Sequence, residues 1–390
     1  MDGLRPTSSL DRFAARKLAA REEHGLRRHL VPTLRKTESQ AERDGMPLVS
    51  FCCNDYLGLS QHPGIIGAAR DALDRYGAGA GASRLVTGNH PLYAPLENQL
   101  ARLKQTDAAC VFGSGYLANL GIPPALMGRD DLIVADELIH ASLHAGIRAS
   151  GARVVFFAHN HMDDCRDKLR AHRAAYSHCL LVTEGVFSMD GDRAPLAALC
   201  DLADTHDAWL MTDDAHGLGV LGGGRGSAAE AGVAGRIPLQ MGTLSKAVGA
   251  YGGFLCASQP VIELMVNRAR TLIYETGLPP ATLAASLAAL ELIETDSVLV
   301  AAPLKYAKQF TTALALPEAE SAIVPLIVGA PGRALAASQA LAARGFLVTA
   351  IRPPTVPDGT ARLRFTFSAS HSEDDIDRLV GAVREIGLAG

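Results

Sequence analysis

The sequence predicts an α/β protein with a large domain, whose mostly parallel sheet is flanked by helices, and a smaller α+β domain. Three observations support this prediction. From about residue 90, short apolar runs alternate with helical stretches, and after about residue 290 strands and helices are interleaved more closely. The chain has 390 residues, of which 48% are apolar and 20% charged, which is typical of a globular protein that buries a sizeable core.

The apolar runs of the first part are rich in β-branched residues and apolar on both faces. Runs of this kind, separated by helical stretches, are typical of a parallel sheet with crossover helices. Leu92, Leu96, Leu100 and Leu103 mark one face of a helix that precedes them. The predicted strands are AACVFGS (108–114), DLIVAD (131–136), ARVVFF (152–157), HCLLVTEG (178–185) and AWLMTDD (208–214).

The N-terminal segment and the last part of the chain, after about residue 290, supply the remaining elements. Residues 10–30 predict a basic amphipathic helix, and a final helix begins at Ser372, which forms a capping pattern with Asp375. The packing points of the first helix are expected to be Leu10, Phe13, Leu18 and Leu30. The strands of the smaller domain are expected in SAIVPLIVG (321–329), GFLVTAI (345–351) and ARLRFTFS (361–368).

Charge and cysteine content exclude several classes of protein. With 37 basic and 41 acidic side chains, the formal charge of −4 gives no electrostatic reason to expect nucleic acid or an anionic membrane as partner. No stretch approaches the ~20 apolar residues of a membrane span, and no signal peptide is visible. The seven cysteines are scattered and form no C-x-x-C pair, which indicates reduced core thiols. We therefore expect a soluble, cytoplasmic protein.

A glycine motif after the AWLMTDD run does not predict a dinucleotide site. Gly217, Gly219 and Gly222 match G-x-G-x-x-G, but a glycine run follows where a helix should begin. The next strand also lacks an acidic residue at its tip. A nicotinamide cofactor is therefore not expected.

The histidines do not predict a metal site. His140 and His144 have the i, i+4 spacing of a helical metal site, but alanine stands where a zincin has its glutamate. His144, His159 and His161 are interpreted as solvated or packing histidines. No metal is expected.

The strongest local signal is GTLSKAVGAYGGF (242–254). Its single lysine, Lys246, lies among small and apolar residues, and desolvation there would make a neutral amine available for Schiff-base chemistry. The hydroxyls of Thr243 and Ser245 and the nearby glycines suit a phosphate. A lysine packed in a turn is the alternative interpretation.

Two further segments agree with this chemistry. Asp213 ends the AWLMTDD run, where a buried carboxylate could keep a pyridinium nitrogen protonated, and His216 could bond the phenolic oxygen of the same ring. GSGYLAN (113–119) lies at a strand-to-helix junction, where the amides of Gly115 and Tyr116 would face a phosphate. Together these residues predict a site for pyridoxal 5′-phosphate.

With these residues in view, the chain resembles the α-oxoamine synthases, pyridoxal-phosphate enzymes that condense an amino acid with an acyl thioester and release carbon dioxide. The resemblance covers nearly the whole chain. It implies the fold-type-I aminotransferase architecture and a homodimer with active sites at its interface. The matching motifs are NDYLGLS (54–60), GSGYLAN, HASL (140–143), TEGVFSMDGD (183–192), DDAHG (213–217) and the lysine segment.

The resemblance implies a role for each matching residue. Lys246 would form the internal aldimine and later remove the α-proton, while His140 would stack on the ring and bond the substrate carboxylate. Asp213 would pair with the ring nitrogen and His216 with the phenolic oxygen. Contacts with the cofactor or its phosphate are implied for Gly115, Tyr116, Ser188 and Thr243, with Thr276 reaching the phosphate of the partner subunit, and contacts with the substrates for Arg27, Asn54, Arg352 and Thr355.

Within the family, IRPPTVPDGTARLR (351–364) favours a member that joins L-alanine to a pimeloyl thioester, carried by coenzyme A or acyl carrier protein, in biotin synthesis. Alternatives are 2-amino-3-ketobutyrate ligase, 5-aminolevulinate synthase, a long-chain acyltransferase or an aminotransferase of the same fold. A binding protein with a dead site is disfavoured because Lys246, Asp213, His216 and His140 are all present. The expected domains are an N-terminal helical segment (1–47) that packs with the small domain, a large cofactor domain (48–290) and a small domain (291–390).

Overall fold

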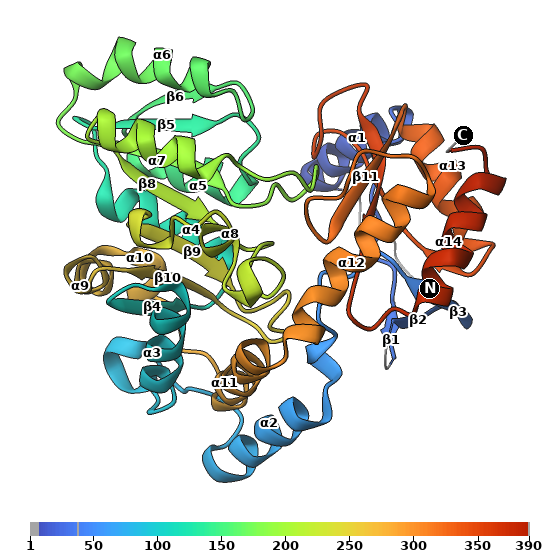
Figure 1. Cartoon of the computed structure of the whole chain (residues 1–390), viewed down its shortest axis with the longest axis horizontal. Helices are drawn as coiled ribbons and strands as arrows, with labels where there is room; N and C mark the ends of the chain where they lie inside the picture. The colour runs from blue at the N-terminus through green and yellow to red at the C-terminus, as the bar shows by residue number, and fades with distance from the viewer. Residues whose placement is uncertain (1–7, 37–38, 389–390) are drawn as a thin grey trace. The chain divides into compact units, whose positions relative to one another are not determined.

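The computed structural model describes residues 8–36 and 39–388 (Figure 1). The chain divides into two compact units, of which the first comprises Met1–Cys52, Pro325–Phe365 and Asp377–Gly390 and the second Cys53–Val324 and Thr366–Ile376. The sequence placed the end of the large domain at residue 290. The structure keeps the following helix with the second unit because Val300 is buried in the same core as Leu290 and Ile293.

The second unit is built on a seven-stranded sheet, in the order β4-β10-β9-β8-β7-β5-β6. Neighbouring strands from β9 to β6 pair in parallel, and β10 pairs antiparallel with both β4 and β9. The mostly parallel sheet predicted from the apolar runs is confirmed, whereas β10 arises from a segment that the sequence indicated only as glycine-rich. The strands are β4 (Ala108–Phe112), β5 (Leu132–Asp136), β6 (Arg153–Phe157), β7 (Cys179–Glu184), β8 (Trp209–Asp213), β9 (Leu239–Thr243) and β10 (Gly253–Ala257).

Helices cover both faces of this sheet, because alternate residues of its strands are apolar toward each face. Ile133 and Ala135 of β5 lie in one core with residues of α4 and α5, and Leu132 and Val134 lie in another with residues of α6 and α7. Figure 1 shows these layers around β5 and β8. The helices of the unit are α2 (Pro63–Tyr76), α3 (Tyr93–Lys104), α4 (Gly115–Leu126), α5 (Ala141–Ser150), α6 (Met162–His172), α7 (Leu196–Thr205), α8 (Ser227–Glu230), α9 (Gln259–Arg268), α10 (Arg270–Ile273), α11 (Pro280–Thr295) and α12 (Ser297–Ala313).

The first unit contains two smaller sheets, β1-β2-β3-β12 and β11-β14-β13. The predicted strand GFLVTAI is divided between them, because the chain passes from β12 to β13 at the buried Val348, whose carbonyl accepts a hydrogen bond from Ser338. Its strands and helices are β1 (Leu34–Arg35), β2 (Gln40–Arg43), β3 (Met46–Ser50), β11 (Ile323–Gly329), β12 (Phe346–Leu347), β13 (Thr349–Ile351), β14 (Ala361–Thr366), α1 (Ser9–Glu23), α13 (Pro331–Ala342) and α14 (Glu373–Glu385), with β11, β14 and α14 crossing into the second unit.

The predicted terminal helices form, but α1 differs from the prediction in extent and in packing. It ends at Glu23 instead of extending to residue 30, so Leu30 lies outside it. The capping pattern before α14 is present, since the Ser372 hydroxyl and amide bond Asp375 and the Asp375 amide bonds Ser372. In α1, however, no residue is buried, and Leu10 and Phe13 are 71% and 51% exposed. The expected packing points are therefore exposed among the residues that the structure describes.

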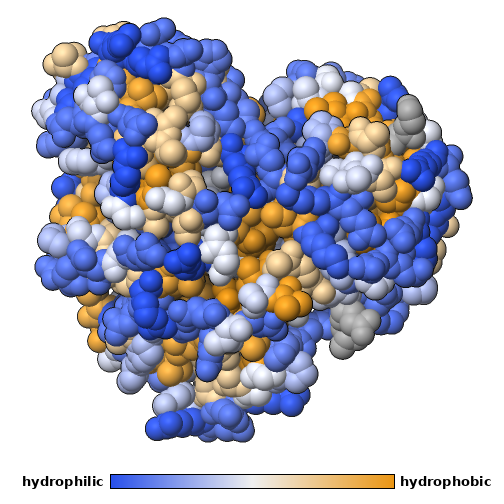
Figure 2. Space-filling view, viewed as in Figure 1, coloured by the Kyte–Doolittle hydropathy of each residue, from blue (hydrophilic) through white to orange (hydrophobic). Residues whose placement is uncertain are grey.

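The surface visible in Figure 2 is mostly hydrophilic, with hydrophobic residues in patches between hydrophilic ones. Among residues 8–36 and 39–388, none of the helices combines the length and apolar character needed to cross a bilayer.

A buried ion pair connects α3 to the turn that follows β8. Lys104 and Asp214 have side chains only 1% and 2% exposed, and the Nζ–Oδ2 distance is 2.5 Å. Lys104 also donates to the Arg225 carbonyl at 2.8 Å, and the Ser227 amide donates to the Asp214 carboxylate at 3.1 Å. Gly226 (φ +97°) approaches the carboxylate so closely that a Cβ there would lie 1.9 Å from Oδ2.

We expect Lys104→Met to lower the free energy of unfolding by about 3–5 kcal/mol, because it leaves the Asp214 carboxylate buried without its cation. Urea denaturation followed by circular dichroism measures this change. The matched control is Lys168→Met, which removes a partly exposed pair with Asp164 at 3.5 Å and should cost less than about 1 kcal/mol. A loss no larger than that of the control would contradict the expectation.

Candidate active site

Polar side chains gather at one edge of the large sheet, where β4, β7, β8 and β9 all end. Because these strands run in the same direction, their carboxyl ends meet at one edge, the usual place for a ligand site in such sheets. A cavity of about 240 Å³ opens there. Its lining includes seven of the predicted residues, Gly115, Tyr116, His140, Asp213, His216, Thr243 and Lys246, together with Ser114, Asn119, Ser142, Glu184, Ala215, Met241 and Ser245.

Lys246 and His216 lie at one end of a chain of hydrogen bonds. Lys246 Nζ is 2.7 Å from His216 Nε2, and His216 Nδ1 is 2.6 Å from the Tyr56 hydroxyl, which donates to Asn54 Oδ1 at 3.3 Å. With Tyr56 as the donor to Asn54, His216 Nδ1–H donates to Tyr56, and Nε2 accepts from Lys246. The predicted residue Asn54 is thus connected to the cavity through Tyr56.

Asp213 ends β8 and is held by donors from a helix and a turn. Asn119 of α4 donates to Oδ2 at 2.6 Å, and the Ala215 amide donates to Oδ1 at 3.0 Å. The same amide group of Asn119 bonds the Ser142 hydroxyl at 3.0 Å, which lies 2.6 Å from His140 Nδ1. These contacts place His140, at the N-terminus of α5, and Asp213 in one network.

A second carboxyl group, Glu184, lies at the end of β7 and is 2% exposed. Burial raises its pKa well above the usual range, and the negative charge of Asp213 raises it further. A protonated carboxyl group at this position would be a hydrogen-bond donor beside the Asp213 carboxylate.

The cavity's other end is suited to an anion. Ser114 caps α4, so the first amides of that helix, beginning at Gly115, point toward the cavity end. Thr243 bonds the Ser245 hydroxyl at 2.8 Å beside them. Gly253 of β10 passes so close that a Cβ there would lie 2.4 Å from the Ser114 carbonyl oxygen, which explains why this strand needs glycine.

Two predicted cofactor residues are outside the lining. The Ser188 amide donates to Glu184 Oε2 at 3.3 Å, so Ser188 is one contact away from the cavity. Thr276 is exposed and pairs with Ser83 in an isolated β-bridge.

The other predicted substrate residues lie in the first unit, in a separate cavity of about 840 Å³. Arg27 forms an ion pair with Glu22 at 3.1 Å, and Arg352 donates to the Gly25 carbonyl. Thr355 accepts a hydrogen bond from Arg28 at 3.0 Å. These three residues therefore share one basic cavity, and their contribution to catalysis stays a prediction.

The sequence interpretation assigned no role to four residues of the site, although each lies in a motif it singled out: Tyr56, Asn119, Ser142 and Glu184. Asn119 follows Gly115 by four residues on α4, so helical spacing could have placed both on one face. Tyr56 meets His216 across 160 positions of chain, for which no local pattern gives a signal.

The interpretation of the remaining histidines needs one correction. His144 packs against Phe156, with ring centroids 5.3 Å apart. His159 is neither solvated nor simply packed, because it lies between two carboxylates, Asp136 and Asp192. Its partners come from the end of β5 and from the loop that follows β7, which the AHNH motif could not indicate.

The cavity thus combines an amine, two buried carboxyl groups and an anion-binding helix terminus. The carboxylate of Asp213 suits a cationic ring nitrogen, the amine of Lys246 suits a carbonyl group, and the α4 terminus suits a phosphate. The residues present therefore fit a phosphorylated, ring-containing aldehyde.

Comparisons with known proteins give relatives over nearly the full chain. Residues 47–383 match the family described as Aminotransferase class I and II. The 8-amino-7-oxononanoate synthase of Methylobacterium nodulans is 58% identical over 98% of this chain and 99% of the relative. That of Methylocella silvestris is 63% identical over 88% of this chain and 98% of the relative.

Solved structures give the same picture of the fold. The serine palmitoyltransferase of Sphingomonas wittichii matches with a TM-score of 0.91 and 30% identity, over 99% of this chain and 100% of that chain. The 8-amino-7-oxononanoate synthase of Francisella tularensis matches with a TM-score of 0.73 and 27% identity, over 87% and 98%.

We expect the pKa of the His140 imidazole to lie below the ordinary value for histidine. Partial desolvation in the cavity lowers the pKa of His140, and the Lys246 charge lowers it further, whereas the Asp213 charge opposes both. Asp213→Asn should therefore lower the pKa again. Titration of the imidazole ¹³C–¹H signals by NMR checks both statements, and a higher His140 pKa in Asp213→Asn would contradict them.

Proposed function

We infer the function from one premise: this chain belongs to the class I and II aminotransferase family and, within it, to the 8-amino-7-oxononanoate synthases. The enzyme condenses L-alanine with a pimeloyl thioester and releases carbon dioxide and free thiol. The product is 8-amino-7-oxononanoate, in biotin biosynthesis. Coenzyme A and acyl carrier protein are both proposed as thioester carriers.

One observation supports this choice over the other members of the fold. Identity to named 8-amino-7-oxononanoate synthases reaches 57–63% over 88–98% of the chain, whereas identity to the serine palmitoyltransferase structure is 30%. A shared fold supports many substrates, so the higher sequence identity supports a pimeloyl thioester as the acyl donor.

The enzyme depends on pyridoxal 5′-phosphate, which supplies an electron sink for the α-carbon of the bound amino acid. We propose that Lys246 holds it covalently through the side-chain amine. Asp213 would pair with the ring nitrogen, and His216 would bond the phenolic oxygen. His140 would stack on the ring and bond the substrate carboxylate.

Three predicted residues would form the phosphate end of the cavity. The amides of Gly115 and Tyr116 begin α4, and the Thr243 hydroxyl lies beside them. Helix amides and hydroxyls of this kind bind phosphate. Ser188 would contact the cofactor from the loop behind Glu184.

Lys246 would also act as the base that takes the α-proton of alanine. His216 Nε2 lies 2.7 Å from Lys246 Nζ, and Tyr56 bonds the other ring nitrogen of His216. The His216 ring therefore holds the Lys246 amine in position. The exclusion of water by the buried Tyr56 and Glu184 strengthens the electrostatic contacts inside.

Substrate carboxylates and the surroundings of the thioester would be contacted by Arg27, Asn54, Arg352 and Thr355. Arg27 and Arg352 line the basic cavity of the first unit with Thr355. Their guanidinium groups suit a carboxylate such as the free end of a pimeloyl chain.

A homodimer would complete the site, with Thr276 reaching the phosphate of the partner subunit. Leu85, Val86 and Tyr274 are 58%, 73% and 72% exposed, and the bridge between Ser83 and Thr276 brings their segments together. Exposed apolar residues that gather in this way are typical of a protein interface. We assign this surface to a second copy of the chain.

The cytoplasmic location of the enzyme stays a prediction.

The function is tested by a substrate screen. Alanine, glycine and serine are each combined with short, pimeloyl and long acyl thioesters while thiol and carbon dioxide release are measured. Alanine with the pimeloyl thioester should exceed the other pairs by about tenfold or more. Transfer of the amino group to a keto acid instead, without thiol release, would favour an aminotransferase.

Lys246→Ala is the matched inactive variant for this screen. Loss of the proposed base and covalent anchor should reduce turnover by at least about 100-fold, with an unchanged circular dichroism spectrum. Undiminished carbon dioxide release by this folded variant would overturn the role of Lys246.

The role of Thr276 is tested by mixing two inactive variants. Lys246→Ala and Thr276→Asp are unfolded together, refolded and assayed as hybrid dimers. If Thr276 serves the partner's site, each hybrid holds one intact site, and about one quarter of wild-type activity should return. No return of activity, with hybrid dimers shown by mass spectrometry, would place Thr276 in its own subunit's site.

A further inference from the structure

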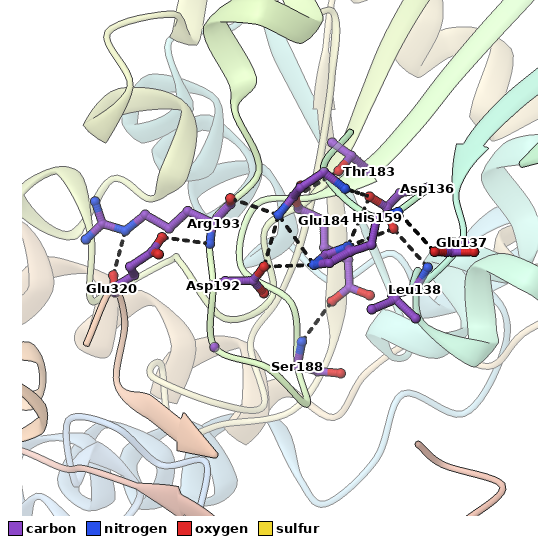
Figure 3. Close-up of polar contacts among 12 residues, drawn as sticks. Asp136, Glu137, Leu138, His159, Thr183, Glu184, Ser188, Asp192, Arg193 and Glu320 are labelled. Carbon is purple, nitrogen blue, oxygen red and sulfur yellow. Dashed lines mark hydrogen bonds and ion pairs between the residues drawn. The ribbon is translucent and has the colours of Figure 1, made fainter. Parts of the chain in front are cut away.

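His159 lies just after β6, with each ring nitrogen against a different carboxylate (Figure 3). Nδ1 is 3.0 Å from Asp136 Oδ1, and Nε2 is 2.8 Å from Asp192 Oδ2. The Asp136 side chain is fully buried, and that of His159 is 21% exposed. Both nitrogens are therefore engaged, and His159 forms a bridge between two acids.

The two acids belong to loops that reach the proposed site. Asp136 ends β5 and begins the loop 136–140, which carries His140; its Oδ1 also accepts from the Leu138 amide at 2.9 Å. Asp192 closes the loop 185–192, because the Phe187 amide donates to its carbonyl at 3.0 Å. The same loop carries Ser188, whose amide holds the Glu184 carboxyl group.

Neighbouring contacts fix the bridge on both sides. The Asn160 amide donates to Asp136 Oδ2 at 2.9 Å, and its side chain donates to Asp192 Oδ2 at 3.0 Å. The His159 amide donates to Glu137 Oε1 at 3.1 Å, and the His159 ring meets Phe187 edge-on at 4.4 Å. A small shift of either acid would therefore break several contacts at once.

We propose that His159 is a positioning residue: by bridging Asp136 and Asp192, it sets the spacing between the loop that carries His140 and the loop that carries Ser188. It touches neither substrate nor cofactor and acts through these two loops. The inference rests on the proposed function for the roles of His140 and Ser188, but the bridge itself stands on the contacts described above.

The charges around the ring support a cationic bridge. Asp136 and Glu137 face His159 from the β5 loop, and Asp192 faces it from the β7 loop; Arg193 is turned to Glu230 and Glu320. Burial lowers the pKa of His159. Hydrogen bonds and charge attraction from Asp136 and Asp192 outweigh this effect and raise the pKa of His159 to about 10.

The raised pKa of His159 determines how its contribution to the stability of the fold changes with pH. A histidine whose pKa is higher in the folded than in the unfolded protein stabilises the fold fully below its unfolded value, near 6.5. That contribution falls as pH rises and is lost at about pH 10. An NMR titration of the apoprotein should show one imidazole that keeps its proton to about pH 10, and this signal should be absent from His159→Gln.

The decisive experiment measures cofactor binding and turnover in three variants. In His159→Gln a neutral side chain replaces the cation between the acids, so the loops should move apart. In His159→Gln/Asp192→Asn the two introduced amides can bond each other while the new glutamine still donates to Asp136, which rebuilds the bridge without charge. His172→Gln, at the end of α6, is the matched control.

We expect His159→Gln to weaken binding of pyridoxal 5′-phosphate to the apoprotein by about 10- to 100-fold and to lower kcat similarly. The double variant should recover most of both, and the control should match wild type. A merely structural role would lower the unfolding midpoint but leave both quantities unchanged in the folded protein at low temperature, and that result would overturn the proposal.

Cofactor binding is measured without substrates, so it is independent of the proposed reaction. If the wild type does not turn over alanine and pimeloyl thioester, the proposed function fails while the binding comparison still tests His159. Equal cofactor dissociation constants in wild type, His159→Gln and His172→Gln would contradict the positioning role.

Discussion

Two consecutive carboxylates, Asp213 and Asp214, are buried at the end of β8, and the rest of the site depends on partners for both. Successive side chains leave a strand on opposite faces, so the two acids need partners on different sides of the sheet. Asp213 is held by Asn119 of α4 and by the Ala215 amide, and Asp214 by Lys104 of α3. Because an unpaired buried charge costs several kcal/mol, these contacts fix both helices and the turn that carries His216.

Cations paired with buried acids also hold the walls of the cavity in place. Lys104 lies behind the turn after β8, and His159 lies behind the loops after β5 and β7. Each is a cation placed among acids away from the reacting groups, so the side chains that face the cavity remain available for a ligand. Rigid support of this kind keeps reactive groups within the small tolerances that catalysis requires.

The environment of the cavity also shifts the pKa values of its acidic and basic groups in opposite directions. Burial beside Asp213 raises the pKa of Glu184, while desolvation lowers that of His140. The chain of contacts from Lys246 through His216 and Tyr56 to Asn54 links the proposed base to a residue expected to contact substrate. Structures named serine palmitoyltransferase and 8-amino-7-oxononanoate synthase share this fold, so the fold alone does not determine the substrate.

The sequence by itself determined the elements and the local chemistry. Apolar runs on both faces predicted β5, β7 and β8, and Ser372 with Asp375 predicted the start of α14, because these features depend on residues near each other in the chain. Lys246, Asp213 and His216 could be identified because each lies in a short pattern at the end of a strand. Tertiary structure alone decided that β10 pairs antiparallel, that Tyr56 meets His216, and that His159 lies between Asp136 and Asp192. The physical reason is that periodicity is a local property, whereas the order of strands in a sheet decides which distant side chains share one edge.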